Sequence, residues 1–192
     1  SYIPSQFDNP SNPKAHYLYT AEEIWNDTDG KVDIIIAGAG TGGTITGLGQ
    51  KLKEKNKNIE IVAVEPYSSQ VLAGKEAKVH KLQGIGANFI PQNFKKEFID
   101  EILPIKDEDA IKTAQELAKK EGILTGFTGG ANVYAAIGRE LLKIQPLLEF
   151  LSTTNDVRKH IKKFVNIYIN NQKKSFYKEA SLESVTIPRV KG

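Results

Sequence analysis

A glycine-rich segment at residues 38–44 has the residue types and the spacing to bind a phosphate group. In the sequence DIIIAGAGTGGTITG, which starts at Asp33, an apolar run passes directly into closely spaced glycines and threonines. The pattern predicts a strand, a tight turn and a helix N-terminus, where free backbone N–H groups and the helix dipole attract an anion. Glycines let the backbone approach that anion because they carry no Cβ atom.

The spacing of these residues leaves the kind of phosphate open. The glycines fit the GxGxxG pattern of dinucleotide-binding loops, with Gly38 first and Gly43 last. Glu65 follows at the predicted end of the next strand, where an acid that binds ribose is expected. The threonines on both sides of the double glycine suit instead a compact phosphate monoester surrounded by donors. A tight structural turn without a ligand is the third interpretation.

Strands alternating with helices are predicted to hold this turn in place. A helix is expected from an N-cap and proline at residues 12–13 to a turn at residues 29–30. The short apolar run at residues 32–37 predicts a strand buried on both faces. After the glycine turn, the pattern predicts a helix over residues 45–55 and a second buried strand over residues 59–66.

The alternation continues in the second half of the chain. Residues 67–93 are irregular, and so long a loop is typical of a functional region. The remaining predicted elements are a strand at 102–105, a helix at 106–121 that ends at Gly122, a brief strand, a small-residue turn and a helix within 123–143, and an amphipathic helix at 155–171. Together these elements predict an α/β fold, a layered sheet with flanking helices.

The composition excludes several classes of site and partner. The 192 residues include no cysteine, which excludes disulfides, thiol catalysis and zinc–thiolate sites, and the 3 histidines lack the spacing of metal ligands. A net charge of +3, with basic and acidic residues interleaved, argues against a nucleic-acid partner. No apolar run approaches the roughly 18–20 residues of a membrane span, and no signal-peptide pattern is visible, so a cytoplasmic location without a membrane partner is predicted.

Five segments in order resemble the cysteine synthase and cystathionine β-synthase family of pyridoxal-phosphate enzymes, which has the tryptophan synthase β-like fold, or fold type II. They are SQFDNPSNPKAHY, AGAGTGGTITG, VEPYSSQVLAG, HKLQGIGANFIP and EGILTGFTGGANVYAA, and the resemblance covers residues 1–143. It favours pyridoxal 5'-phosphate over a dinucleotide as the ligand of the glycine-rich turn.

The resemblance also implies a role for individual residues. The phosphate is expected to be bound by Gly40, Thr41, Gly42, Gly43 and Thr44. Thr128 occupies the position of the family hydroxyl that faces the pyridine nitrogen, which leaves the ring unprotonated and suits β-elimination and replacement. Gln6 is expected to help hold the substrate carboxylate, and Gly84 to border the substrate pocket. No metal ligand is implied.

The family's Schiff-base lysine lies in a region before the first of these segments, and no segment of this chain resembles it. The resemblance therefore implies that residues 1–145 are part of the large, phosphate-binding domain without most of the small N-terminal domain. Residues 146–192 are interpreted as a divergent C-terminal helix and tail. No catalytic residue is predicted here, and the chain alone is expected to be inactive. A haem-binding motif would lie in the same preceding region.

The implied activity is β-replacement in cysteine biosynthesis. GIGA with Ala87 and HKLQ resemble cysteine synthase, which uses O-acetylserine and sulfide. GTGGTITGLGQKLKEK and DVRKHIKKF resemble cystathionine β-synthase, which uses serine and homocysteine, so this activity is the alternative. An amino-acid substrate and a homodimer of the full-length form are expected. The alternative of another class is a non-catalytic, truncated homologue that acts as a binding partner.

Overall fold

The computed structural model describes the backbone of residues 3–151 and the side chains of residues 3–139. The chain divides into two compact units, Ser1–Arg139 and Glu140–Gly192, and the architecture described below is that of the first. The amphipathic helix predicted at residues 155–171 lies outside the described residues. Among the described residues, no helix combines the length and the apolar character that crossing a membrane requires.

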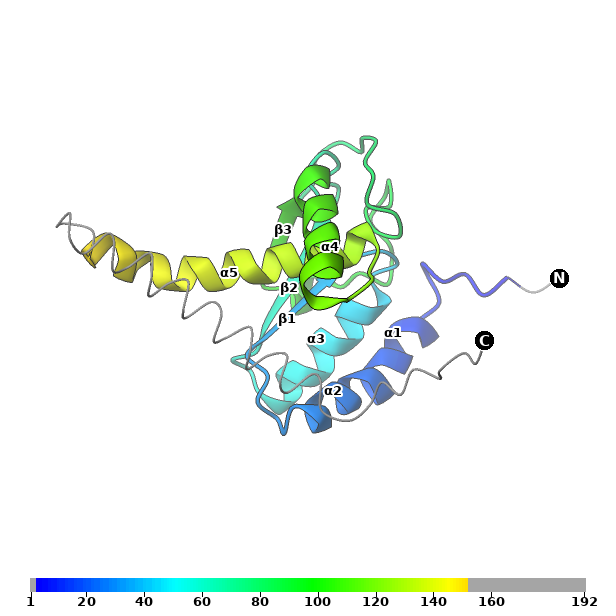
Figure 1. Ribbon diagram of the computed structural model, residues 1–192. Helices are drawn as coiled ribbons and strands as arrows, with labels where there is room; N and C mark the ends of the chain where they lie inside the picture. The colour runs from blue at the N-terminus through cyan, green and yellow to red at the C-terminus, as the bar shows by residue number, and fades with distance from the viewer. Residues whose placement is uncertain (1–2, 152–192) are drawn as a thin grey trace, which may run out of the picture. The chain divides into compact units, whose positions relative to one another are not determined.

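A parallel three-stranded sheet forms the centre of the first unit (Figure 1). Its strands are β1 (Ile34–Gly38), β2 (Glu60–Pro66) and β3 (Glu101–Ile105), in the order β1-β2-β3. In the register, Gly38 lies beside Val64, and Val64 lies beside Leu103. The predicted α/β layered sheet with flanking helices is confirmed.

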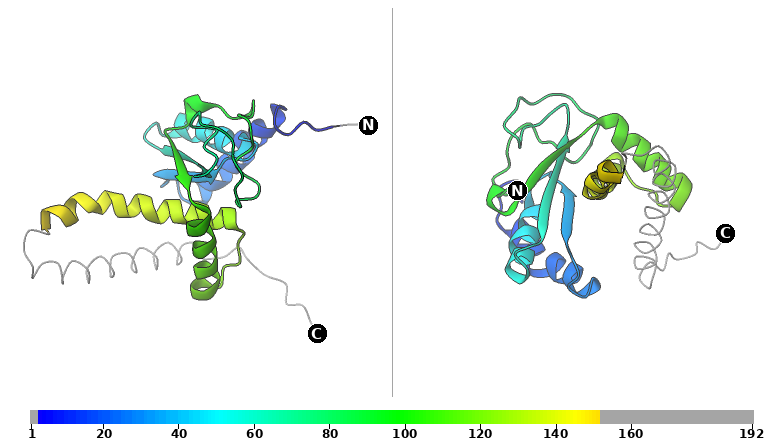
Figure 2. Two further views of the ribbon diagram at one scale, coloured as in Figure 1. Left: turned by 90° about the horizontal axis from the view of Figure 1, so that it is seen from above. Right: turned by 90° about the vertical axis from the view of Figure 1, so that its left-hand side faces the viewer.

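Helices cover both faces of this sheet (Figure 2). On one face, α3 (Gly43–Lys55) packs against apolar side chains that include Ile61 and Ala63 of β2. On the other face, α4 (Asp107–Glu121) and the start of α5 (Phe127–Leu151) pack against Val64. Successive side chains of a strand point to opposite faces, so β2 contributes to both cores.

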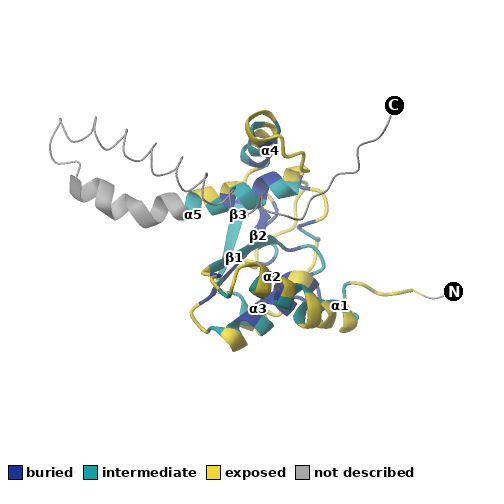
Figure 3. Cartoon of the chain, turned by 60° about the horizontal axis from the view of Figure 1, so that its bottom comes forward, coloured by how far each residue is buried: buried dark blue, intermediate teal, exposed yellow. Residues whose placement is uncertain are grey.

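The strands differ in burial, as Figure 3 shows. From Ile61 onward β2 is buried, as its sequence predicts, because it lies between two neighbours and under helices on both faces. The prediction that β1 is buried on both faces is wrong, since all of its residues are partly exposed. Within the described residues β1 is an edge strand, which its apolar sequence does not reveal.

The N-terminal helix is continuous but changes its type. It consists of α1 (Ser11–Ala15), a π-helical turn η1 (His16–Thr20) and α2 (Ala21–Asp27). The predicted N-cap at Asn12 is wrong, because the helix begins at Ser11 after Pro10. The Asn9 side chain accepts the Ser11 N–H at 2.9 Å, so a local turn starts the helix earlier and releases the Asn12 side chain for other contacts.

The C-terminal elements of the sheet unit follow the sequence in part. Helix α4 ends at Gly122, which has φ 69° and the left-handed conformation expected of a C-terminal stop. A short 3₁₀ turn, η2 (Lys96–Phe98), precedes β3. The brief strand predicted after Gly122 is absent, since residues 123–126 form no helix or strand and Leu124 is exposed. Helix α5 also continues to Leu151 rather than ending near Lys143.

Candidate phosphate-binding site

The turn between β1 and α3 places backbone N–H groups at the start of a helix. Gly42 adopts the left-handed conformation with φ 79° and precedes Gly43, the first residue of α3. The N-cap residue Gly42 has no side chain to cap this helix, and the Gly43 N–H donates to Thr41 Oγ1 at 3.3 Å. The N–H groups that follow in the first turn point out of the helix, toward any anion bound there. The helix dipole adds partial positive charge at the same place.

A hollow of about 250 Å³ lies over this turn. It is lined by Gly38, Gly40, Thr41, Gly42, Thr44, Ile45 and Gly84. The lining offers backbone N–H groups and two hydroxyls but no carboxylate, which is the donor set that a phosphate monoester requires. The Gly84 loop and the phosphate loop, far apart in the sequence, thus share one hollow.

The glycines of this turn are needed for the close approach of neighbouring segments. A Cβ atom on Gly40 would lie 2.3 Å from the Gly84 carbonyl oxygen, and one on Gly42 would lie 2.7 Å from the backbone of Phe94. A Cβ atom on Gly43 would lie 2.0 Å from the Asn12 side-chain oxygen. Gly43 therefore makes room for the N-terminal helix, Gly40 for the Gly84 loop and Gly42 for the backbone of Phe94.

Two side chains that the sequence analysis did not select reach the hydroxyls of the turn. The Asn12 amide nitrogen donates to Thr41 Oγ1 at 3.0 Å, and His16 Nε2 lies 3.0 Å from Thr44 Oγ1. His16 Nδ1 in turn lies 3.0 Å from Thr20 Oγ1. Asn12 and His16 both belong to the NPSNPKAHY segment, whose resemblance to the family was the only sequence signal that could have found them.

Thr128 lies near the start of the phosphate turn but does not line the hollow. Its hydroxyl donates to the Gln83 carbonyl at 2.7 Å, next to Gly84. A Cβ atom on Gly38 would lie 3.2 Å from the Thr128 methyl carbon, so the first turn of α5 touches the end of β1. The structure thus brings Thr128, Gly84 and the phosphate turn to the same edge of the sheet.

Gln6, like Thr128, does not line the hollow. Its side chain is exposed, and its backbone carbonyl accepts N–H groups from Asn12 at 2.8 Å and Asn93 at 2.9 Å. The segment that carries Gln6 is therefore tied to the phosphate turn through Asn12.

Glu65 is not available to bind a ribose. The side chain is 1% exposed, and its Oε2 atom accepts the Leu72 N–H at 2.9 Å. Burial raises the pKa of the Glu65 carboxyl above its ordinary value, although the N–H groups of Leu72 and Ala73 act in the opposite direction. This carboxyl organises the loop after β2, so the dinucleotide interpretation loses the acid on which it depends.

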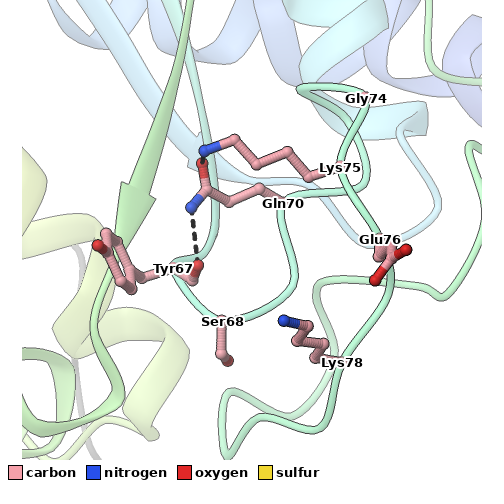
Figure 4. A pocket seen from close by; sticks show the side chains of 7 residues that line it. All are labelled: Tyr67, Ser68, Gln70, Gly74, Lys75, Glu76 and Lys78. Atoms are coloured by element: carbon pink, nitrogen blue, oxygen red, sulfur yellow. Dashed lines mark hydrogen bonds between the residues drawn. The ribbon is translucent and has the colours of Figure 1, made fainter.

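A larger hollow of about 640 Å³ lies within the loop after β2 (Figure 4). Gln70 donates to the Tyr67 carbonyl at 2.8 Å, and Lys75 Nζ donates to Gln70 Oε1 at 2.9 Å. This hollow shares no lining residue with the phosphate turn, and its lining includes both basic side chains, Lys75 and Lys78, and an acidic one, Glu76.

Within the described residues, no group of three or more His, Cys, Asp or Glu side chains could hold a metal ion.

Comparisons with known proteins agree with this geometry. The chain is 53% identical over 132 residues to cysteine synthase 3 of Caenorhabditis elegans, covering 69% of this chain and 39% of that relative. It is 51% identical over 156 residues to cysteine synthase B of Campylobacter jejuni, covering 81% of this chain and 51% of the relative. A crystal structure of cysteine synthase from Entamoeba histolytica matches with a TM-score of 0.67 and 54% identity, covering 69% of this chain and 39% of that chain.

The chain spans about half of the length of these relatives, or less. The family model described as pyridoxal-phosphate dependent enzyme matches residues 1–147, which is more than half of the chain and includes the phosphate turn and the first turns of α5. The predicted resemblance is confirmed: the chain belongs to the family of pyridoxal-phosphate dependent enzymes.

Proposed function

We propose that this chain is the phosphate-binding part of a cysteine synthase, which converts O-acetylserine and sulfide to cysteine and acetate. The observation that carries the proposal is the hollow between the phosphate turn and Gly84, which offers N–H and hydroxyl donors and no carboxylate. The names of the relatives, at 53% and 51% identity, support sulfide rather than homocysteine as the second substrate.

The residues of this chain would mainly bind and orient the cofactor and substrate. The N–H groups that begin α3 and the hydroxyls of Thr41 and Thr44 would donate to the phosphate oxygens. Pyridoxal phosphate, when bound, supplies an electron sink for charge that develops at the substrate α-carbon. The two other predicted roles remain proposals. The Thr128 hydroxyl, which donates to the Gln83 carbonyl in this structure, would turn to the pyridine nitrogen when the cofactor binds, and Gln6 would help hold the substrate carboxylate.

Proton transfer is assigned to a group outside this chain's described residues. On the family resemblance, the active-site lysine belongs to the part of the relatives that this chain does not match.

The division into a phosphate-binding domain at residues 1–145 and a divergent segment at 146–192 is likewise part of the proposal. We also propose a homodimer of the full-length form and a location in the cytoplasm, to be tested by light scattering and cell fractionation.

Binding of 4'-deoxypyridoxine 5'-phosphate to the 192-residue chain tests the site. This analogue lacks the aldehyde of the cofactor, so it cannot react with surface lysines. Calorimetry should show binding of the analogue and much weaker binding of 4'-deoxypyridoxine, the same molecule without its phosphate. Equal affinity for the two would contradict the assignment of the turn to the cofactor phosphate.

The size and activity of the protein in its source cells test the reaction. An antibody to this chain should detect a protein clearly larger than the chain itself, since the match of 156 residues covers only 51% of the Campylobacter relative. That protein should form cysteine from O-acetylserine and sulfide. Formation of cystathionine from serine and homocysteine would support the alternative acceptor. An inactive protein of this chain's own mass would support a non-catalytic binding partner.

A further inference from the structure

We propose that Asn12 is a positioning residue that turns the hydroxyl hydrogen of Thr41 toward the bound phosphate and ties the Gln6 segment to the same turn. The inference rests on the proposed function, because it concerns the ligand of that site. Asn12 does not line the hollow, so its effect must pass through the residues that it contacts.

The first step is the hydrogen-bond count at Thr41. Its Oγ1 atom accepts an N–H of the Asn12 amide at 3.0 Å and the backbone N–H of Gly43 at 3.3 Å. A hydroxyl has two acceptor lone pairs and one hydrogen, so these two donors use its acceptor capacity. The hydrogen of Thr41 must then point elsewhere, and Thr41 lines the hollow. Asn12 thereby presets Thr41 as a donor, which favours an anion over a neutral ligand.

The second step is the link between Thr41 of the phosphate turn and the segment that carries Gln6. The same amide nitrogen of Asn12 donates to the Gln6 carbonyl at 2.8 Å, so one amide group uses both of its hydrogens. The Gln6 carbonyl also accepts the amide of Asn93, which is 3% exposed. Asn93 thus holds the Gln6 segment without touching Thr41, and it provides a natural control.

The third step is the fit of Asn12 against α3. The Asn12 side-chain oxygen fits against α3 only because residue 43 is glycine. A Cβ atom added at this position would lie 2.0 Å from that oxygen. An aspartate has the same shape as asparagine, but it replaces the donating nitrogen with an acceptor and adds negative charge beside the phosphate. A donor is therefore required at this position, and not merely a side chain of this size.

The test compares the affinities of 4'-deoxypyridoxine 5'-phosphate and unphosphorylated 4'-deoxypyridoxine, measured by calorimetry on the full chain and its variants. Asn12→Ala and Asn12→Asp should weaken binding of the phosphorylated analogue about tenfold or more, and the preference for the phosphorylated form should fall by the same factor. Asn93→Ala should lower the unfolding midpoint but leave this preference within about twofold. In a Thr41→Val background, Asn12→Ala should cost less than about twofold, because the mediating hydroxyl is gone.

The outcomes separate the inference from the proposed function. If the unsubstituted chain shows no preference for the phosphorylated analogue, the proposed function fails and the inference fails with it. If it shows the preference and the Asn12 variants keep it, Asn12 only supports the fold and the inference alone is overturned. Equal losses of preference in the Asn12 and Asn93 variants would also overturn it.

Discussion

The loops that follow β1 and β2 leave the same edge of the parallel sheet, and each begins with backbone N–H groups that need an acceptor. After β2, the buried carboxylate of Glu65 accepts the Leu72 N–H, so the acceptor is part of the chain. After β1, the turn carries glycines and hydroxyls, and the N-cap residue of α3, Gly42, has no side chain to accept a hydrogen bond. A loop at this edge is thus closed by an acceptor that belongs to the chain, or it is left open for an external anion.

Gly40→Ala should have the largest effect on ligand affinity, because the added methyl group closes the loop after β1. The added Cβ atom would lie 2.3 Å from the Gly84 carbonyl oxygen, so one of the two segments must move. We expect affinity for 4'-deoxypyridoxine 5'-phosphate to fall about 100-fold, as overpacking at a rigid site commonly costs 1–3 kcal/mol.

Gly126→Ala is the matched control for this variant, because its Cβ atom would meet nothing within 4 Å. Its affinity, measured by calorimetry, should equal that of the unsubstituted chain. An affinity of Gly40→Ala within about threefold of the control would show that the hollow is not the ligand site.

Glu65→Ala should affect the closed loop and spare the open one. It leaves the buried Leu72 N–H without its acceptor and creates a cavity, so we expect the free energy of unfolding to fall by about 3 kcal/mol. Urea unfolding measures this loss. Affinity of the folded variant for the phosphorylated analogue should stay within about threefold, and a larger loss would mean that the two loops are not independent.

Thr44→Val removes one hydrogen-bond donor from the open loop after β1. A hydrogen bond to a charged group commonly contributes 1.5–3 kcal/mol, so we expect about tenfold weaker binding of the phosphorylated analogue. Thr46→Val is the control, since its buried hydroxyl accepts the Lys95 N–H and does not line the hollow. Calorimetry should show unchanged affinity for that control, together with reduced stability. Equal effects of the two variants on affinity would contradict a specific role for Thr44.

Glu65→Gln should have the smallest effect, visible in the pH dependence of stability. Burial raises the pKa of Glu65 in the folded chain above the ordinary value of 4.5, so the protonated carboxyl favours folding. That contribution is complete below the unfolded pKa and is lost as pH rises through the raised folded pKa. The variant should therefore gain stability relative to the unsubstituted chain as pH rises from 4.5.

Urea unfolding of both proteins between about pH 4.5 and pH 8 measures this difference, and titrations common to both proteins cancel in it. A difference in unfolding free energy that stays constant with pH would show that the pKa of Glu65 is not raised by folding.

The sequence alone determined the order of the elements around the sheet and the location of the phosphate turn. Both follow from local signals: apolar runs for β1 and β2, acidic and basic ends with Gly122 for α4, and glycines before α3. The family could also be identified at this level, because its motifs are contiguous segments. Such features depend on residues a few positions apart, whose preferences act before the chain folds.

Only the tertiary structure decided which face of each element is covered and which side chains meet. Within the described residues it made β1 an edge strand, left residues 123–126 outside the sheet and placed Glu65 in a buried contact with Leu72. It also brought Asn12 to Thr41, 29 positions away. These outcomes depend on close packing of segments distant in the sequence, where a glycine without a Cβ atom determines how near two backbones can come.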